Sequence, residues 1–320
     1  MQAPLYMPLL RGKYYELQLL GRNTSLLRKA PIVPIIEPVS RDTGNLEKLV
    51  QCFSGTHLPM GVIVNPAVGD FVQSPIDLQD CLSSLLARGS AVFPVVRTAQ
   101  GSVPEEMLKN TEKIAVLQDS AVGPDFLQSI SLIPSQVRYH IVDTAVVSPL
   151  DESQRLAPTI LLCDGFIRRR NVDYPPDEAF LSGPRRLDLR GALGWSDYSI
   201  VGAKFSQGGG RPYAVAIHIT YWDSRGAMRV RHYLSDSNAG PDDPAGKFGE
   251  AVGKLVQDVD QNGSNILETT AVQEFRLLHQ HGDFPGLGPI KRLSMHHHFE
   301  TVSRRPVAST GTLERISPRA

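Results

Sequence analysis

The feature that most constrains the fold of this chain is a local pattern that repeats along much of its length. Each repeat is a short run of apolar, largely β-branched residues that ends in a polar residue and precedes a helix-start signal. The runs are apolar on successive residues, which is typical of parallel strands covered on both faces. Their starts lie about 20 to 40 residues apart, the length of a βα unit. The runs cover residues 6–10, 32–36, 62–64, 92–96, 114–117, 139–142, 159–162 and 198–201.

Eight runs of this kind predict an α/β protein built on a closed (β/α)8 barrel of the TIM type. An open, doubly wound α/β sheet is the alternative, although it would need fewer strands. Residues 213–221 alternate between apolar and polar side chains, and residues 228–234 follow after a short turn, which favours an antiparallel hairpin. This hairpin, 213–234, is either an insertion after the last barrel strand or contains that last strand itself.

Helices are predicted between the runs and after the hairpin. Ser74 and Ser102 each stand shortly before a proline and a carboxylate, which is the pattern of a helix N-terminus. Apolar residues recur at helical spacing through 244–302, so we expect residues 1–302 to form a single barrel domain that includes the hairpin and these helices. Residues 303–320 are polar and aperiodic, and we expect a flexible tail.

Composition excludes some classes of function. Lys plus Arg and Asp plus Glu both number 33, whereas proteins that coat nucleic acid usually carry a strong basic excess. This balance leaves a local anion pocket possible. The cysteines, Cys52, Cys81 and Cys163, form no CxxC pair and predict free, buried thiols. No apolar run approaches the ~20 residues of a membrane helix and no signal peptide is recognisable, so we expect a cytoplasmic protein.

Charged or amide side chains follow nearly every predicted strand. Because all strands of a βα-barrel point the same way, the residues that end them converge on one rim, where barrel enzymes place their sites. The competing interpretation is that strand ends are loops, and loops are polar in any protein. The strand-end residues are Arg11, Lys13, Glu37, Asn65, Arg97, Asp119, Asp143, Asp164 and Lys204.

The carboxylates of this set predict a site for a hard cation such as Mg²⁺, which prefers oxygen ligands. We expect Glu37, Asp119, Asp143 and Asp164 to be the metal ligands, with Glu37, Asp143 and Asp164 also catalytic. Such a site would suit cleavage or transfer at a phosphoryl centre, as in a metal-dependent hydrolase or phosphodiesterase. The alternative is a rim of ion pairs that compensate one another and bind no ligand.

The cations of the same set predict a site for an anion. Arg168 begins a run of three arginines beside Phe166 that could hold a phosphate, although the acidic residues that follow also fit a solvated loop with local salt bridges. His218 lies on the opposite side of its strand from Ile217 and Ile219, and therefore faces either a cavity or solvent. The candidate ligand-binding residues are Arg11, Lys13, Asn65, Arg97, Arg168, Lys204 and His218.

Several segments together resemble the "beta protein" family of bacteria and phages. They are PIIEP at 34–38, IVNPAVGDF at 63–71, SDYSIVG at 196–202, AVAIHITY at 214–221 and FPGLG at 284–288. The resemblance covers about residues 6 to 298. Members of that family often lie near mobile-element and phage-defence genes, so the resemblance implies a role in defence. It carries over no catalytic residue.

We therefore expect a barrel that binds an anionic, phosphorylated or nucleotide-like ligand at the carboxyl ends of its strands, with metal-assisted phosphoryl chemistry in phage defence. The alternative is a non-catalytic partner or scaffold subunit of a multi-protein defence system, with the hairpin 213–234 and the C-terminal helices as its interaction surface. Converging carboxylates would favour the first hypothesis, and charges locked in salt bridges would favour the second. A protein partner fits either hypothesis, whereas a membrane fits neither.

Overall fold

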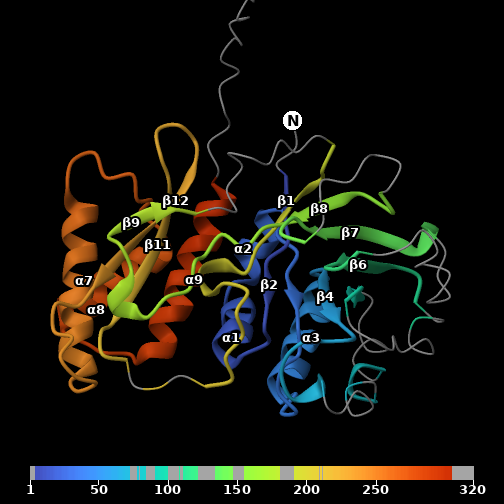
Figure 1. The fold of residues 1–320 in the computed structure, drawn as a ribbon, viewed down its shortest axis with the longest axis horizontal. Coiled ribbons are helices and arrows are strands. Elements are labelled where there is room, and N and C mark those ends of the chain that lie inside the picture. The colour runs from blue at the N-terminus through green and yellow to red at the C-terminus, as the bar shows by residue number, and fades with distance from the viewer. Residues whose placement is uncertain are drawn as a thin grey trace, which may run out of the picture.

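The computed structural model of the chain has two halves that lie side by side, each built around its own sheet (Figure 1). It describes residues 4–72, 78, 80–83, 91–99, 108, 111–121, 134–146, 155–180, 191–208, 210 and 212–304. The helix starts predicted at Ser74 and Ser102, and residues 305–320 of the predicted tail, lie outside this part of the chain.

The first half contains a nine-stranded sheet in which every pair of neighbouring strands is parallel, curled into a half-barrel. The α/β class and the parallel pairing predicted from the sequence are thus correct. The strand order follows the chain without the reversal that defines a doubly wound sheet, so that alternative is wrong. The strands are β1 (Leu5–Tyr6), β2 (Leu9–Leu10), β3 (Ile35–Ile36), β4 (Met60–Ile63), β5 (Val92–Arg97), β6 (Ile114–Gln118), β7 (Val137–Asp143), β8 (Thr159–Leu162) and β10 (Gly194–Ser196).

The closed eight-stranded barrel is not confirmed, because β1 and β2 stand at the two open ends of the row of strands. These two strands are nevertheless consecutive pieces of one segment, interrupted at Pro8, which has no backbone N–H to donate. On one side of this segment, Met7 N donates to Trp195 O at 2.9 Å. On its other side, Ile35 N donates to Pro8 O at 2.8 Å. The segment therefore has hydrogen-bond partners along both of its edges.

The eighth predicted strand, 198–201, is wrong. The strand forms at Gly194–Ser196 instead, where a Cβ on Gly194 would lie 1.8 Å from the carbonyl oxygen of Leu5, so that only glycine fits. Ser199–Val201 is a 3-10 turn in which Ser199 has a φ of 52°. The carboxylate of Asp197 accepts a hydrogen bond from Ser199 N at 2.8 Å, and such a local side-chain bond favours a turn over a continued strand.

Three helices accompany the first strands: α1 (Tyr14–Arg22), α2 (Thr24–Lys29) and α3 (Gly44–Thr56). The apolar face predicted for α3 is buried, including Leu46, Leu49, Val50 and Phe53. Helix α1 packs against α3 on one side and against the last helix of the chain on the other. All three cysteines are free, as predicted, but they are half-buried and not buried as expected.

The second half is an antiparallel sheet covered by helices. The predicted hairpin forms from β11 (Ala216–Trp222) and β12 (Met228–Leu234), and β9 (Asp177–Ala179) adds a third strand that the sequence did not predict. The helices are α7 (Pro244–Asp260), α8 (Thr270–His281) and α9 (Leu287–Ser303). Among the described residues, no helix combines the length and apolar character needed to cross a bilayer.

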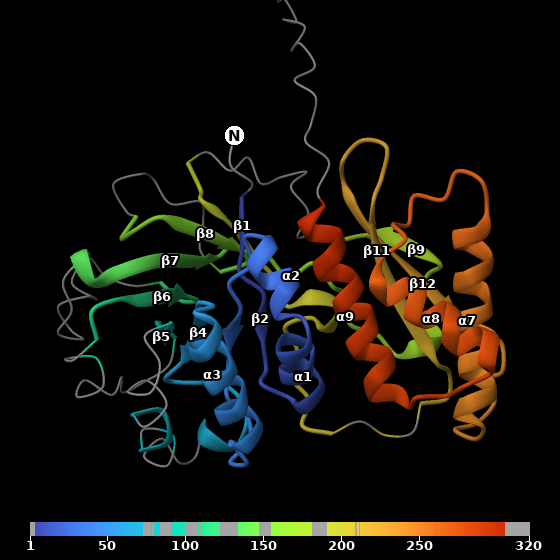
Figure 2. The same ribbon diagram turned by 180° about the vertical axis from the view of Figure 1, so that it is seen from behind.

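Helix α9 joins the two halves, because it packs against β11 on one side and α1 on the other (Figure 2). It is buried around almost its whole circumference, and His297 and His298 are fully shielded from solvent. One hydrophobic cluster runs across the junction and includes Tyr6, Trp195, Trp222 and Phe299. The loops that follow β8 and β10 also lie against β11 and α9, and this junction positions the site.

Candidate functional site

The charged residues at the ends of neighbouring parallel strands form one network of ion pairs. Glu37 is fully buried after β3, and its Oε1 accepts hydrogen bonds from Arg97 Nη1 at 3.0 Å and from Ala67 N at 2.7 Å. Its Oε2 pairs with Arg11 Nη1, which follows β2. Arg97 Nη2 in turn lies 2.5 Å from Asp119 Oδ2 after β6. The strand-end charges do converge, and they neutralise one another.

Asn65 supports this network through the backbone. Its Nδ2 donates to Arg97 O at 2.9 Å, and its Oδ1 accepts from Arg97 N at 2.8 Å. The amide thereby continues the pairing of β4 with β5 by one residue. The two hydrogen bonds hold Arg97 in place, which makes Asn65 a positioning residue rather than a contact for a ligand.

The predicted magnesium site is not formed by the described residues, in which no group of three His, Cys, Asp or Glu side chains is arranged to hold a metal ion. Glu37 is occupied by two arginines, as above. Asp143 Oδ1 accepts from Ala145 N at 2.9 Å, and Asp164 accepts from Phe166 N at 3.3 Å and from Ala203 N at 2.9 Å. Burial raises the pKa of Asp143 and of Asp164. Asp143 and Asp164 shape loops, and the catalytic and metal-binding roles predicted for the four carboxylates have no support in this geometry. Glu37 and Asp119 are held in ion pairs, which is the arrangement that the partner-subunit hypothesis predicts for strand-end charges.

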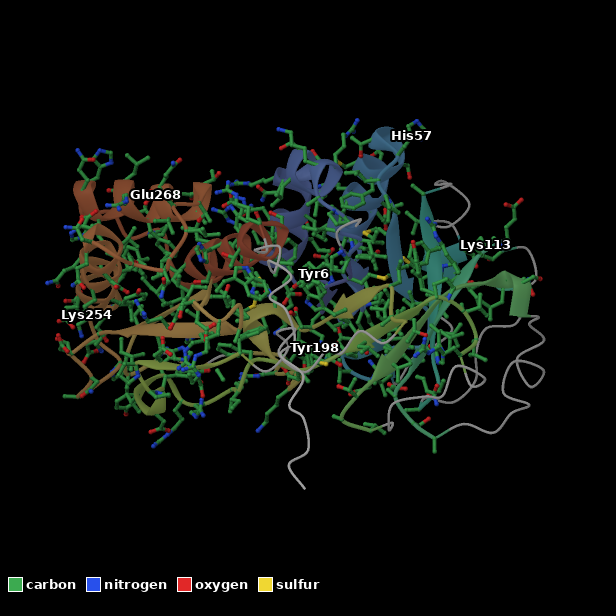
Figure 3. All side chains as sticks on the ribbon, turned by 90° about the horizontal axis from the view of Figure 1, so that it is seen from above. Tyr6, His57, Lys113, Tyr198, Lys254 and Glu268 are labelled. Atoms are coloured by element: carbon green, nitrogen blue, oxygen red, sulfur yellow. The ribbon has the colours of Figure 1, made fainter. Side chains whose placement is uncertain are left out.

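Three adjoining cavities lie where the strand ends meet the second half, and Arg168 lines all of them. Their volumes are about 970, 250 and 190 Å³. Figure 3 places Tyr6 and Tyr198 in this central region, between Lys254 at the outer end of one half and Lys113 at the outer end of the other. The cations that line the cavities are Arg11, Lys13, Arg168, Arg169, Arg170, Lys204 and Lys291.

Four of these cations form what we call the cation cluster: Lys13, Arg168, Lys204 and Lys291. Within the described residues, none of the four has a carboxylate partner at salt-bridge distance. Arg168 Nη1 donates to Lys204 O at 2.7 Å, and Lys13 Nζ donates to Ser206 O. The carbonyl oxygens carry only a partial negative charge, so the full positive charges of the cluster are not neutralised.

The other two arginines of the run predicted to bind an anion are neutralised. Arg169 makes a bidentate pair with Glu178, at 2.5 and 2.9 Å, and the exposed Arg170 pairs with Asp173 at 2.7 Å. The salt-bridge interpretation is therefore confirmed for Arg169 and Arg170, and the anion-binding interpretation stays a prediction for Arg168. Two of them form the local salt bridges of a loop, and Arg168 alone faces the cavities without a carboxylate among the described residues.

Burial and neighbouring charges lower the pKa of two members of the cluster, Lys13 and Lys291. Burial lowers the pKa of Lys13, and the nearby charges of Arg168 and Arg11 lower it further. The pKa of Lys291 is lowered by burial and by the charges of Lys13 and Arg168. Glu16 opposes both effects, but burial raises its own pKa and so disfavours its negative form. The cavities therefore have a positive electrostatic potential that an anion would relieve.

The largest cavity also offers flat apolar surface and amide groups. Phe205 and Tyr213 line it, Tyr213 is 56% exposed, and Lys13 Nζ lies 5.0 Å from the centre of the Phe205 ring. Asn171 and Asn238 line the same cavity. Aromatic rings beside cations are the combination that binds a nucleobase and its phosphates together.

The structure thus divides the residues predicted to bind a ligand. Arg11, Lys13, Arg168, Lys204 and His218 line the cavities, whereas Asn65 and Arg97 belong to the ion-pair network behind them. Sequence reasoning missed the residues that the second half and the connecting loops contribute. No local signal identifies them, because each lies in an otherwise ordinary helix or loop; they are Lys291, Phe205 and Tyr213.

No protein-family model matches this chain, and no curated protein shows significant similarity to it. The resemblance to the "beta protein" family therefore stays a prediction, and so does the defence role that it implies. The geometry of the cavities is the basis for a functional conclusion.

Proposed function

We propose that this protein binds an anionic, phosphorylated ligand in the cavities around Arg168. The observation that carries the proposal is the cation cluster. Its four positive charges line adjoining cavities in which Glu16 is the one acidic side chain among the described lining residues, and none of the four forms a salt bridge with it. Arg168, Lys204 and Lys291 are exposed and Lys13 is half-buried, so a ligand can reach all four, and a bound phosphate would place a negative charge among these like charges. Arginine suits the role, because its planar guanidinium can donate two parallel hydrogen bonds to a phosphate.

We further propose that the ligand is nucleotide-like. The cavity of about 970 Å³ is at the upper end of the size of small-molecule sites and leaves room for a base and a sugar as well as phosphates. Phe205 and Tyr213 offer ring faces for stacking, which is worth about 1–3 kcal/mol per base. In this proposal the cluster binds the phosphates, and the aromatic rings bind the base.

The ion-pair network has a supporting role in this proposal. Arg11 pairs with Glu37 and also donates from Nη2 to Ala203 O at 2.6 Å. Ala203 directly precedes Lys204, so the network fixes the loop that presents a member of the cluster. Glu37 and Arg97 then act on the ligand through the position of other residues.

We also infer that the curled sheet closes into an eight-stranded barrel through the segment 5–10. The support is the hydrogen bonding of that segment along both edges, interrupted at Pro8. Amide hydrogen exchange tests the closure, since the amides of Met7 and Ile35 should exchange as slowly as those of β6. Fast exchange at Met7 with slow exchange in β6 would mean that the sheet stays open there.

A ligand panel tests the anion-binding proposal. We expect a nucleoside triphosphate to raise the thermal unfolding midpoint, with inorganic phosphate raising it less and an uncharged nucleoside least. Arg168→Ala should abolish most of the shift. Lys113→Ala, at the far end of the first half in Figure 3, should leave it unchanged. The alternative function, a non-catalytic partner subunit, would be favoured if no anion on the panel stabilised the protein.

A further inference from the structure

The cavity of about 250 Å³ contains a candidate reactive group besides its cations. His218 of β11 lines this cavity together with Arg168, Arg169 and Lys291. Its strand register places it directly opposite His232 of β12. Neither histidine takes part in the binding role proposed above. The histidine pair therefore adds a second kind of chemical group to the cavity besides its cations.

The two histidines and a carboxylate form a chain of hydrogen bonds across the antiparallel sheet. His218 Nδ1 lies 2.7 Å from His232 Nδ1, and His232 Nε2 lies 3.1 Å from Glu178 Oε1 in β9. Glu178 is ionised, because it also accepts both hydrogen bonds of its bidentate pair with Arg169. The third strand, β9, is what brings the carboxylate into the chain.

The sequence of hydrogen bonds from Glu178 to His218 determines which ring nitrogen of each histidine carries the proton. Ionised Glu178 can only accept, so His232 carries its proton on Nε2 and presents a lone pair at Nδ1. His218 then donates from Nδ1 to that lone pair. Its Nε2 is left without a proton, and no described residue is hydrogen-bonded to it. The free lone pair of His218 is therefore the end of the chain on the cavity side.

The surroundings keep both rings neutral. Burial lowers the pKa of His218, and the positive charge of Lys291 lowers it further. Burial also lowers the pKa of His232, although Glu178 opposes the shift. The rings of Phe166 and Tyr174 pack against His218 at centroid distances of 5.0 and 4.7 Å, which fixes its orientation. A neutral, oriented imidazole is an activated nucleophile.

We propose that His218 is a catalytic nucleophile that accepts a phosphoryl group from the ligand bound among the cations of the cavity. This inference rests on the proposed function, since Arg168 and Lys291 would hold the phosphate beside His218. Positive charges around a phosphoryl group also stabilise the charge that it carries in the transition state. His232 and Glu178 are positioning residues, because they act on the phosphoryl group only through His218.

The proposed step balances as follows. The Nε2 lone pair of His218 forms a bond to phosphorus, and the bond from phosphorus to the leaving oxygen breaks. That oxygen keeps the electron pair and leaves as the oxyanion of the remaining phosphate chain, so it needs no proton. The ring of His218 becomes positively charged and loses its Nδ1 proton toward His232, whose own positive charge is then stabilised by Glu178. The product is a phosphohistidine and the dephosphorylated ligand.

Potassium phosphoramidate provides a test that does not require the natural ligand. This small anionic donor transfers its phosphoryl group to histidine nitrogen with loss of ammonia. We expect His218 in the full chain to be phosphorylated at least 10-fold faster than the exposed His57 and His281, as measured by mass spectrometry of an alkaline digest. A purely structural His218, held in a packed histidine pair, would instead react more slowly than the exposed histidines, and that result would overturn the proposal.

Variants separate the nucleophile from the binding site. Glu178→Gln should slow phosphorylation of His218 several-fold while the exposed histidines react as before, because the proton order of the chain is lost. His218→Asn should remove that site of modification alone. If nucleotides stabilise the wild-type protein but His218 stays unmodified, the nucleophile is refuted and the anion site stands. If His218 is modified but no anion binds, the anion-binding proposal fails instead.

Discussion

Two groups of charged residues lie within one molecule and differ in whether their charges are neutralised. In the ion-pair network, Arg11 and Arg97 both pair with the buried Glu37, and Arg97 also pairs with Asp119. In the cation cluster, by contrast, the hydrogen bonds of Lys13 and Arg168 go to backbone carbonyls. The network lies at the ends of parallel strands, and the cluster lies where those ends meet the second half.

The difference separates stability from binding. Charges at strand ends are expected in any parallel sheet, so their convergence does not distinguish a site from a stabilising network. A set of four like charges that line a cavity beside one carboxylate, Glu16, is a stronger indication of a ligand, because the cations outnumber the acidic groups around them. The comparison therefore predicts that changes in the network lower stability, and that changes in the cluster lower affinity.

Replacing Glu37 gives the largest expected effect. Glu37→Gln removes the charge that two buried arginines share, and breaking a buried ion pair costs about 3–5 kcal/mol. Urea unfolding should register this loss in the free energy of unfolding. Glu47→Gln, on the exposed side of α3, serves as the control and should change it by less than about 0.5 kcal/mol. Equal stability of the two variants would mean that the network does not stabilise the fold.

Acid should destabilise both halves, because each holds a buried, neutral histidine. Burial lowers the pKa of His140 in β7 to about 4, and also that of His297 in α9 to about 4. The unfolded state takes up these protons first, near pH 6.5. The stability that each site contributes is therefore lost as the pH falls from about 6.5 to about 4, by roughly 3 kcal/mol per site.

Unfolding curves measured across this pH range test the acid prediction. His140→Gln keeps a polar group that can meet Gln118, whose Oε1 lies 2.8 Å from His140 Nε2. The variant should therefore lose less stability than the wild type as the pH falls, by roughly the 3 kcal/mol that His140 contributes, while the loss due to His297 remains. A wild-type protein whose stability stayed constant between these pH values would contradict both buried sites.

Removing a member of the cluster should separate affinity from stability. Lys204→Ala deletes a cavity-lining charge and should weaken nucleotide binding about 10- to 100-fold, the equivalent of the ~1.5–3 kcal/mol of a hydrogen bond to a charged group. Calorimetric titration measures the affinity, and urea unfolding should give an unchanged midpoint. Arg97→Ala is the matched variant from the network, and it should lower the unfolding midpoint. If the two variants behaved alike, the distinction between network and cluster would be lost.

The smallest effect concerns the repulsion within the cluster. Lys291→Met should slightly raise the stability of the ligand-free protein near pH 7, where Lys291 is charged beside Lys13 and Arg168. The folded pKa of Lys291 is lowered, so the folded state loses this proton before the unfolded state does. Wild-type stability therefore rises as the pH approaches the unfolded pKa of about 10.5, and the gain from the variant shrinks. A gain that grew with pH would contradict the repulsion.

The fold was predictable where a local pattern carried it. Continuous apolar runs identified the parallel strands, and the alternation of 213–221 identified the hairpin. The eighth strand was missed because Gly194–Ser196 is short. It forms where the backbone of Leu5 comes close to Gly194, and no local pattern indicates that contact. Strand β9 was missed for the same reason, since Asp177, Glu178 and Ala179 carry no strand pattern of their own and form a strand only when β12 pairs with them.

The site was predictable only in part. The rule that strand ends converge found Arg11, Lys13 and Lys204, but it also selected the network and a metal site that the described residues do not form. Lys291 contributes to the cluster through the packing of α9 against α1. The chain from Glu178 through His232 to His218 depends on the register of three strands, which the sequence does not specify.

By itself, the sequence determined which residues are apolar, at what period, and where polar side chains interrupt them. These properties are local, so they identify most of the parallel strands and the hairpin, although not β9 and β10. Only the tertiary structure decided which charges meet a partner. Neutralisation depends on distances of a few ångströms between residues far apart in the chain, and packing the second half against the strand ends sets those distances.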